Sequence, residues 1–213
     1  MQAERHTVVV GRSALAGSRD RGGATRVPDD LLLDAAKSCV LNSGVRRTTL
    51  AEIARTAKVS RMTLYRRFPD VHSILAALMT REFGLLLHGV AAEVPHAATA
   101  RERLVRSAVA GVKALVADPL MRTVLDVDAE LVLPYVTQRL GATQKLAEEV
   151  LRDLVVTGQE DGSVRIAEPA VQVRSVLLVV QSFVLSLRPA TAGVSEQALL
   201  IELRHILDAA LAP

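Results

Sequence analysis

Residues 61–68 read Arg-Met-Thr-Leu-Tyr-Arg-Arg-Phe, a run that combines side chains able to bind DNA with two that would anchor a helix. In a helix, Leu64 and Phe68 lie one turn apart on one face, which we expect to pack against neighbouring helices. Arginine pairs with guanine edges or phosphates, threonine contacts base edges or the thymine methyl, and a tyrosine hydroxyl can hold a phosphate. The opposite face of the predicted helix would offer these groups to a DNA groove: Arg61, Thr63, Tyr65, Arg66 and Arg67.

Apolar patterns upstream predict the helices on which this DNA-reading helix must rest. From Pro28, an apolar stripe predicts a helix that ends at Gly44, with Asp29 and Asp30 in its first turn, where carboxylates suit the helix dipole. Thr49 has the spacing of a capping box with the glutamate three residues on, and opens a second helix. The two apolar faces are Leu32, Ala36, Cys39 and Val40 in the first helix, and Leu50, Ile53, Ala54 and Ala57 in the second.

A tight turn separates this second helix from the DNA-reading helix. After a break at residues 58–60, Ser60 is placed to cap a third helix that stops at Pro69. Two short helices joined by such a turn, the later one rich in Arg, Thr and Tyr, predict a helix-turn-helix.

Charge is distributed unevenly along the 213 residues. Residues 1–25 carry four arginines against two acids (net +2), and residues 26–72 carry nine lysines and arginines against five acids (net +4). Residues 73–213 carry thirteen basic against sixteen acidic residues (net −3). A basic N-terminal third suggests a polyanionic partner. Charge alone would equally fit a solvated surface, so the prediction of double-stranded DNA as partner depends on the motif.

Residues 48–68, Thr-Thr-Leu-Ala-Glu-Ile-Ala-Arg-Thr-Ala-Lys-Val-Ser-Arg-Met-Thr-Leu-Tyr-Arg-Arg-Phe, resemble the DNA-binding motif of TetR-family transcriptional regulators. Residues 32–36, Leu-Leu-Asp-Ala-Ala, resemble the family's first helix, and the resemblance covers about residues 28–78. It implies phosphate contacts from Thr49 and Tyr65. It also implies base or near-base contacts from Arg61, Met62, Thr63 and Arg67.

Two positions depart from the family's pattern. Lys58 stands in the inter-helix turn where the family usually has glycine, and a left-handed backbone there would cost on the order of 1 kcal/mol. Val71 and His72 stand where the family usually has lysine, near the start of the fourth helix. We expect His72 either to take over that phosphate contact as a neutral donor or to be a plain surface residue.

The chain divides into three predicted parts: a flexible basic arm (1–27), a helix-turn-helix domain (28–72) and an effector-binding and dimerisation domain (73–213). The arm would either reach a DNA minor groove or have no role. In the third part, apolar spacing predicts helices over 71–93, 101–117, 169–188 and from Ser195 onward, so the whole fold is expected to be all-α. The stripe of the last helix is expected at Leu199, Leu203, Ile206 and Leu207.

The last two predicted helices carry more apolar surface than packing against the rest of one chain would cover. The resemblance implies that they form a four-helix bundle with a second copy, and a homodimer would place two DNA-reading helices on a palindromic operator. The alternative is that residues 175–187 pack only within one chain. This uncharged stretch has thirteen residues, short of the roughly 20 that a spanning helix needs, so we expect a soluble protein with no membrane partner.

Composition also constrains the chemistry. A single cysteine fits a reducing cytoplasm. The sequence lacks the motifs of nucleophilic, metal-dependent and dinucleotide-binding enzymes, so we predict no catalytic residue, no metal and no cofactor. Half of the residues are apolar, but only five are aromatic and none is tryptophan, which leaves little surface for stacking on a flat ring system.

The family resemblance implies a regulator, most often a repressor, that a small effector releases from DNA. The composition favours an apolar effector with a long aliphatic or acyl chain. Two alternatives are a helical enzyme whose N-terminal helices only resemble a DNA reader, and a DNA-binding protein that needs no effector. The pocket residues expected by position are Leu86, Val90, Met121, Tyr135 and Gln181.

Overall fold

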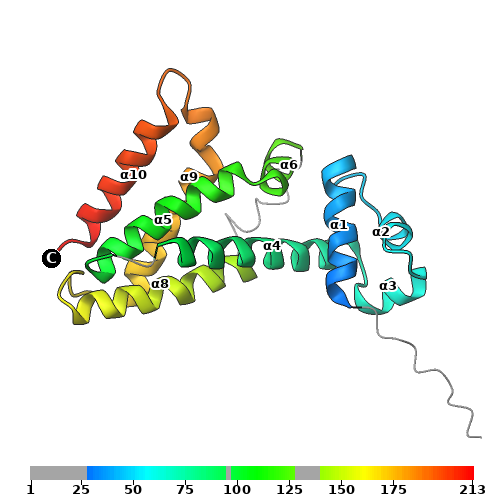
Figure 1. Cartoon of the computed structure of the whole chain (residues 1–213), viewed down its shortest axis with the longest axis horizontal. Helices are drawn as coiled ribbons and strands as arrows, with labels where there is room; N and C mark the ends of the chain where they lie inside the picture. Colours follow the sequence, from blue (N-terminus) through cyan, green and yellow to red (C-terminus); the bar gives the residue numbers. More distant parts are fainter. Residues whose placement is uncertain (1–27, 95–96, 128–139) are drawn as a thin grey trace, which may run out of the picture.

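The computed structural model describes residues 28–94, 97–127 and 140–213, and these ranges contain nine helices and no strand (Figure 1). The predicted all-α fold is confirmed. The arm expected at residues 1–27 and the pocket candidate Tyr135 lie outside the described residues. The helices are α1 (Asp29–Ser43), α2 (Leu50–Thr56), α3 (Arg61–Arg67), α4 (Val71–Glu93), α5 (Ala100–Ala117), α6 (Pro119–Val127), α8 (Ala142–Glu160), α9 (Pro169–Ala190) and α10 (Glu196–Leu211).

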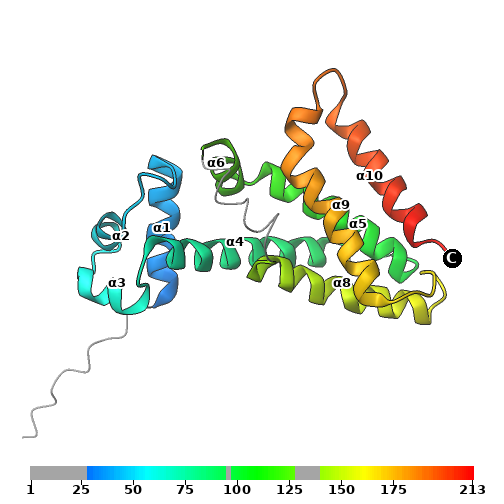
Figure 2. The same cartoon turned by 180° about the vertical axis from the view of Figure 1, so that it is seen from behind.

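Helix α4 links the two parts of the molecule. Figures 1 and 2 show α1–α3 grouped at one end, α4 running from them along a larger helical body, and the C-terminus at the opposite end. Within this body α4 packs on α5 and α8, α9 packs on both α5 and α8, and α10 covers α5 and α9. Helix α6 packs on α1 as well as on α5, so it also reaches across to the small N-terminal group.

Side-chain caps start three of the helices at the positions where the sequence predicts their beginnings. The Thr49 hydroxyl accepts a hydrogen bond from the backbone N–H of Glu52 at 3.2 Å. The Ser60 hydroxyl accepts from the N–H of Thr63 at 3.0 Å, and Ser195 accepts from the N–H of Ala198 at 3.1 Å. Each cap satisfies a backbone donor that has no partner within its own helix, and the caps predicted at Thr49 and Ser60 are confirmed.

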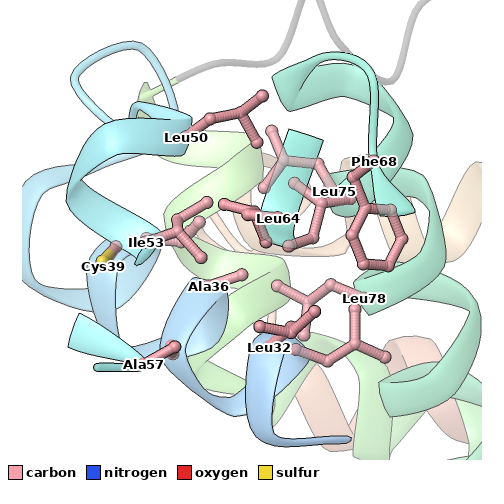
Figure 3. Close-up of a cluster of buried hydrophobic side chains, with 14 of the residues drawn as sticks. Leu32, Ala36, Cys39, Leu50, Ile53, Ala57, Leu64, Phe68, Leu75 and Leu78 are labelled. Atoms are coloured by element: carbon pink, nitrogen blue, oxygen red, sulfur yellow. The ribbon is translucent and has the colours of Figure 1, made fainter. Parts of the chain in front are cut away.

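The N-terminal core is built from α1–α4 together with α6 (Figure 3). Its fully buried side chains include Leu32, Ile53, Leu64 and Leu78. Cys39 is buried in this core as a small apolar residue, with its Sγ 3.4 Å from the hydroxyl of Thr56. Because α4 continues unbroken through residue 72 and contributes to this core, the predicted domain boundary falls inside a helix.

A second core joins α5, α8, α9 and α10, and it corrects the stripe expected on the last helix. The buried stripe is Leu200, Leu203, Leu207 and Leu211, whereas Ile206 is 41% exposed. Helix α10 carries apolar residues on two faces, and periodicity alone does not say which face meets the rest of the chain. The contacts with α5 and α9 select the Leu200–Leu211 face, and Ile206 falls on the outer one.

Helices α4 and α9 are long and apolar enough to cross a membrane by length and composition. Core helices of soluble proteins meet the same criterion. Part of α4 lies in the N-terminal core through Ile74 and Leu78, and part of α9 lies in the second core through Val173 and Val176. Both helices therefore have protein partners along one side.

Candidate DNA-reading surface and ligand cavity

The turn between α2 and α3 has the left-handed backbone conformation that the family resemblance implies at residue 58. Lys58 has φ of 54°, in the left-handed region that favours glycine. The Val59 N–H donates to the carbonyl of Ala54 at 3.0 Å, which closes the turn behind α2. The chain thus makes the helix-turn-helix bend with a lysine, at the modest strain expected for that residue type.

Helix α3 buries one face and exposes the face predicted to read DNA. Leu64 is fully buried and Phe68 is buried beside it. On the other side, Met62 is 76% exposed and Tyr65 is 48% exposed. Arg61 and Arg66 are exposed as well, so this face offers two cations, a hydroxyl and a thioether to a partner.

Two threonines have hydroxyls engaged at helix starts. Thr63 is partly buried, and its hydroxyl lies 2.8 Å from that of Ser60, the cap of its own helix. Its methyl group is the part left for contact with a base. Thr49 is exposed, and within the described part of the chain its oxygen accepts one hydrogen bond, the capping bond, so its hydroxyl proton can still be donated to a phosphate.

Arg67 does not stand free on this surface. Its Nε donates to Oδ1 of Asp29 at 2.6 Å and its Nη2 donates to Oδ2, which makes a bidentate ion pair between α3 and α1. The hydrogen bond and charge of Asp29 raise the pKa of the Arg67 guanidinium above its ordinary value. The sequence suggested only a dipole role for Asp29, because nothing local marks a partner 38 residues away.

A cavity of about 610 Å³ lies in the larger helical body and reaches the end of α1. Its walls come from α4, α5, α6, α8 and α9, and the lining along α4 extends from His72 to Ala91. At roughly 1.5 Å per helical residue this is a length of about 28 Å. His72 is exposed at the start of α4, so it lies at the end of the cavity nearest the helix-turn-helix.

Three of the predicted pocket residues line this cavity: Val90, Met121 and Gln181. Leu86 does not line it in the described part of the chain, whereas its neighbour Leu87 does. The lining positions of α4 include Phe83, Leu87 and Val90, at i, i+4 and i+7. Leu86 is one position off that stripe, a turn of about 100° away on a helix.

Two glutamine side chains supply polar groups to this largely apolar wall. The backbone N–H of Gly141 donates to Oε1 of Gln144 at 2.7 Å, and Nε2 of Gln144 donates to Oε1 of Gln181. Gln144 was not predicted from the sequence, since a glutamine in the first turn of a helix is usually just a capping residue. Among the described residues, no His, Cys, Asp and Glu side chains form a group of three or more that could hold a metal ion.

An ion-pair network joins α1 to the middle of α4. Nη2 of Arg81 lies 2.7 Å from Asp34 and from the neighbouring Glu82, and its Nη1 lies 3.2 Å from Asp30. Lys37 donates to the other oxygen of Glu82 at 2.5 Å. Burial opposes ionisation of Glu82, but the hydrogen bonds from Lys37 and Arg81 outweigh it and hold the pKa of this carboxyl below its ordinary value.

The same network also shifts the pKa of the Arg81 guanidinium. Burial disfavours the charged form of Arg81, yet the hydrogen bonds to Glu82, Asp34 and Asp30 raise its pKa above the ordinary value. Thr80 and Phe83, on either side of the Arg81–Glu82 pair in the sequence, line the cavity. The stretch of α4 that binds α1 is therefore also a wall of the cavity.

Comparison with known proteins agrees with this architecture. Residues 32–78 match the family described as bacterial regulatory proteins, tetR family. An uncharacterized HTH-type transcriptional regulator of Mycobacterium bovis is 40% identical over 177 residues, which cover 83% of this chain and 90% of that protein.

Two solved structures share the fold at low identity. One is the transcriptional regulator FadR of Bacillus subtilis in complex with stearoyl-CoA (TM-score 0.64, 17% identity, 86% of this chain and 100% of that one). The other is a SmeT–triclosan complex (TM-score 0.61, 18% identity, 87% of this chain and 91% of that one). Together with the close relative and the matched helix-turn-helix, these findings show that the chain belongs to the TetR family and is a DNA-binding transcriptional regulator, not an enzyme.

Proposed function

We propose that this regulator is a cytoplasmic repressor that binds a palindromic operator as a homodimer, and that a long-chain acyl effector in the cavity releases it. The observation that carries the proposal is that α4 and α6 contribute the same side chains both to the N-terminal core and to the cavity wall. Leu75, Leu78, Leu120 and Val124 belong to the core beneath the helix-turn-helix and also line the cavity. A ligand that moves these side chains must disturb the support of the DNA-reading surface.

The DNA contacts are proposed from the exposed face of α3 and from the helix starts beside it. Arg61, Met62 and the methyl group of Thr63 would meet base edges, while Thr49, Tyr65, Arg66 and His72 would hold phosphates. Arg67 would fix the angle of α3 against α1 through Asp29, and it would reach DNA only by giving up that pair.

The dimer is proposed from apolar side chains that α9 and α10 leave uncovered. Leu178 is 66% exposed and Ile201 is 51% exposed, each on the outer side of its helix. Val171 and Ile206 add to the same two helices. Apolar faces of this kind are typical of surfaces that bury against a partner, and a second copy of the chain supplies the same faces in reverse.

The effector class is proposed from the residues that line the cavity. Phe83 is the one Phe, Tyr or Trp side chain among the lining residues that the structure describes, and aliphatic side chains make up most of the wall. Stearoyl-CoA in FadR shows that a protein of this fold binds an acyl chain. Triclosan in SmeT shows that another takes an aromatic ligand, so the two classes have to be compared directly.

The coupling would run through α4. A ligand that shifts Phe83 and Thr80 would displace the adjacent Arg81–Glu82 pair and with it the attachment of α1. Couplings between an effector site and a DNA site are typically about 1–3 kcal/mol, enough to change operator affinity by roughly 5- to 150-fold.

Arg61→Ala is expected to lower affinity for a selected operator by about 1–3 kcal/mol and to relax the preference for it over other duplexes. Tyr65→Phe is expected to weaken binding to all duplexes more evenly, because it removes a phosphate contact. The measurement is fluorescence anisotropy with an operator selected from random duplexes, titrated at several salt concentrations. Arg66→Ala, which removes a proposed cationic contact to a phosphate, should reduce the magnitude of the slope of log K against log salt by about 0.9, whereas Tyr65→Phe should leave that slope unchanged.

Arg152→Ala is the matched control, since Arg152 is exposed on α8, away from α3. The selected duplexes should contain inverted repeats with half-sites about 34–36 Å apart or a multiple of it. Unchanged affinity in both Arg61→Ala and Tyr65→Phe would refute the proposed DNA surface.

Long-chain acyl compounds are expected to raise the melting temperature by about 5–10 °C when present at a hundred times their Kd. Gly111→Phe should abolish this shift, because residue 111 lines the cavity and a phenyl ring there would occupy it. Gly111→Ala is the control: a Cβ at this position would lie 3.9 Å from Leu87 Cδ2, an ordinary contact. Stabilisation by triclosan-like aromatics but by no acyl compound would contradict the proposed effector class.

A further inference from the structure

The hydrogen bonds between the two cavity glutamines determine which way each amide points. A backbone N–H can only donate, so the atom of Gln144 that lies 2.7 Å from the nitrogen of Gly141 is its oxygen. The amide nitrogen of Gln144 then faces Gln181 and donates to its oxygen. Gln181 is left with its own NH₂ group on the side away from Gln144.

This NH₂ group forms no hydrogen bond within the described ranges of the chain. Gln181 is partly buried and lines the cavity midway along α9. The lining residues of α9 before and after it are aliphatic: Leu177, Val180, Val184 and Leu185. Before a ligand binds, water can satisfy a donor in such surroundings. The donor loses that partner when an apolar chain displaces the water.

We propose that Gln181 is a specificity-determining residue of the cavity and that it selects effectors with a carbonyl-type acceptor set within an aliphatic chain. This inference rests on the proposed acyl-effector function and sharpens it. The cavity wall is aliphatic on both sides of Gln181. The ligand's acceptor would therefore lie in the middle of the ligand's hydrocarbon chain and not at its end. A ketone, ester or thioester oxygen has the required geometry, whereas a pure hydrocarbon leaves the donor unpaired.

The test compares two ligands of equal chain length, a mid-chain dialkyl ketone and the corresponding n-alkane, by displacement of a fluorescent fatty-acid probe from the full-length protein. Wild type is expected to bind the ketone about 5- to 10-fold more tightly, as one hydrogen bond in an apolar site would give. Gln181→Met keeps the size of the side chain but removes the donor, and it should bring the two affinities within about twofold of each other.

Gln181→Glu is a second variant. It keeps an oxygen that accepts from Gln144 but replaces the NH₂ donor with a second acceptor oxygen. This variant should bind the ketone less tightly than wild type does. Leu177→Met is the control on the same wall and should retain the preference for the ketone. Equal binding of both ligands by wild type would overturn the role of Gln181 but leave the proposed effector class intact. Binding of neither ligand, with aromatics still bound, would instead contradict the proposed effector class. A ketone preference that persists in Gln181→Met would place the donor elsewhere and overturn the inference.

Discussion

Leu64→Ala is expected to lower the free energy of unfolding by about 2–5 kcal/mol, the range for removing a fully buried leucine. Figure 3 places Leu64 between Leu50 and Ile53 on one side and Leu75 and Phe68 on the other. Truncation would leave a cavity at the point where the DNA-reading helix meets its support. Helix α3 has only seven residues, too few to persist without that packing.

Urea denaturation followed by circular dichroism measures this destabilisation, and operator binding should fall with it because α3 is no longer held in place. Met62→Ala separates the two effects. Met62 lies two positions away on the exposed face, so its truncation should change stability by no more than about 0.5 kcal/mol while still weakening DNA binding. A Leu64→Ala protein that unfolds at the wild-type urea concentration would contradict the packing assigned to α3.

Glu82→Gln is expected to lower the free energy of unfolding by about 1–3 kcal/mol at neutral pH, and the difference from wild type is expected to disappear in acid. The side chain of Glu82 is only 12% exposed and accepts hydrogen bonds from Lys37 and Arg81. The amide would keep the shape but remove the charge that compensates two cations.

The pH dependence follows from the lowered pKa of Glu82. A carboxyl whose pKa is lower in the folded than in the unfolded chain stabilises the fold fully above its ordinary value of 4.5. That contribution is lost as the pH falls below 4.5 and through the folded-state value. Urea denaturation at neutral pH and at successive pH values below 4.5 measures the trend. Glu149→Gln, at an exposed position on α8, serves as control; an equal destabilisation at every pH would show that Glu82 acts only through packing.

The Arg81–Glu82 network also bears on the proposed coupling between the cavity and the DNA-binding end. It attaches α1 through Asp30, Asp34 and Lys37, which recur at i, i+4 and i+7 along one face of that helix. Charged side chains on this face are easily taken for a solvated surface. Their partners on α4 make the face an interface between the DNA-binding end and the cavity wall.

Much of the structure of the proposed DNA-reading surface could be predicted from the sequence because its determinants are local. Thr49 and Ser60 cap helices whose first N–H groups lie three residues away. The left-handed turn at Lys58 and the buried pair Leu64 and Phe68 are likewise set within a few positions of one another. Caps, turns and helical periodicity are properties of short segments, so the sequence by itself determined the all-α class and the helix-turn-helix.

Only the tertiary structure decided which side chains meet across the fold. Arg67 pairs with Asp29, and Gln144 pairs with Gln181, over separations of 38 and 37 residues that no periodic pattern encodes. The same holds for the choice of Leu87 over Leu86 at the cavity and for the outward position of Ile206. A helical period identifies an apolar stripe to within about one residue, or 100° of rotation. The exact face turned inward depends on how neighbouring helices pack, and that packing is a property of the whole chain.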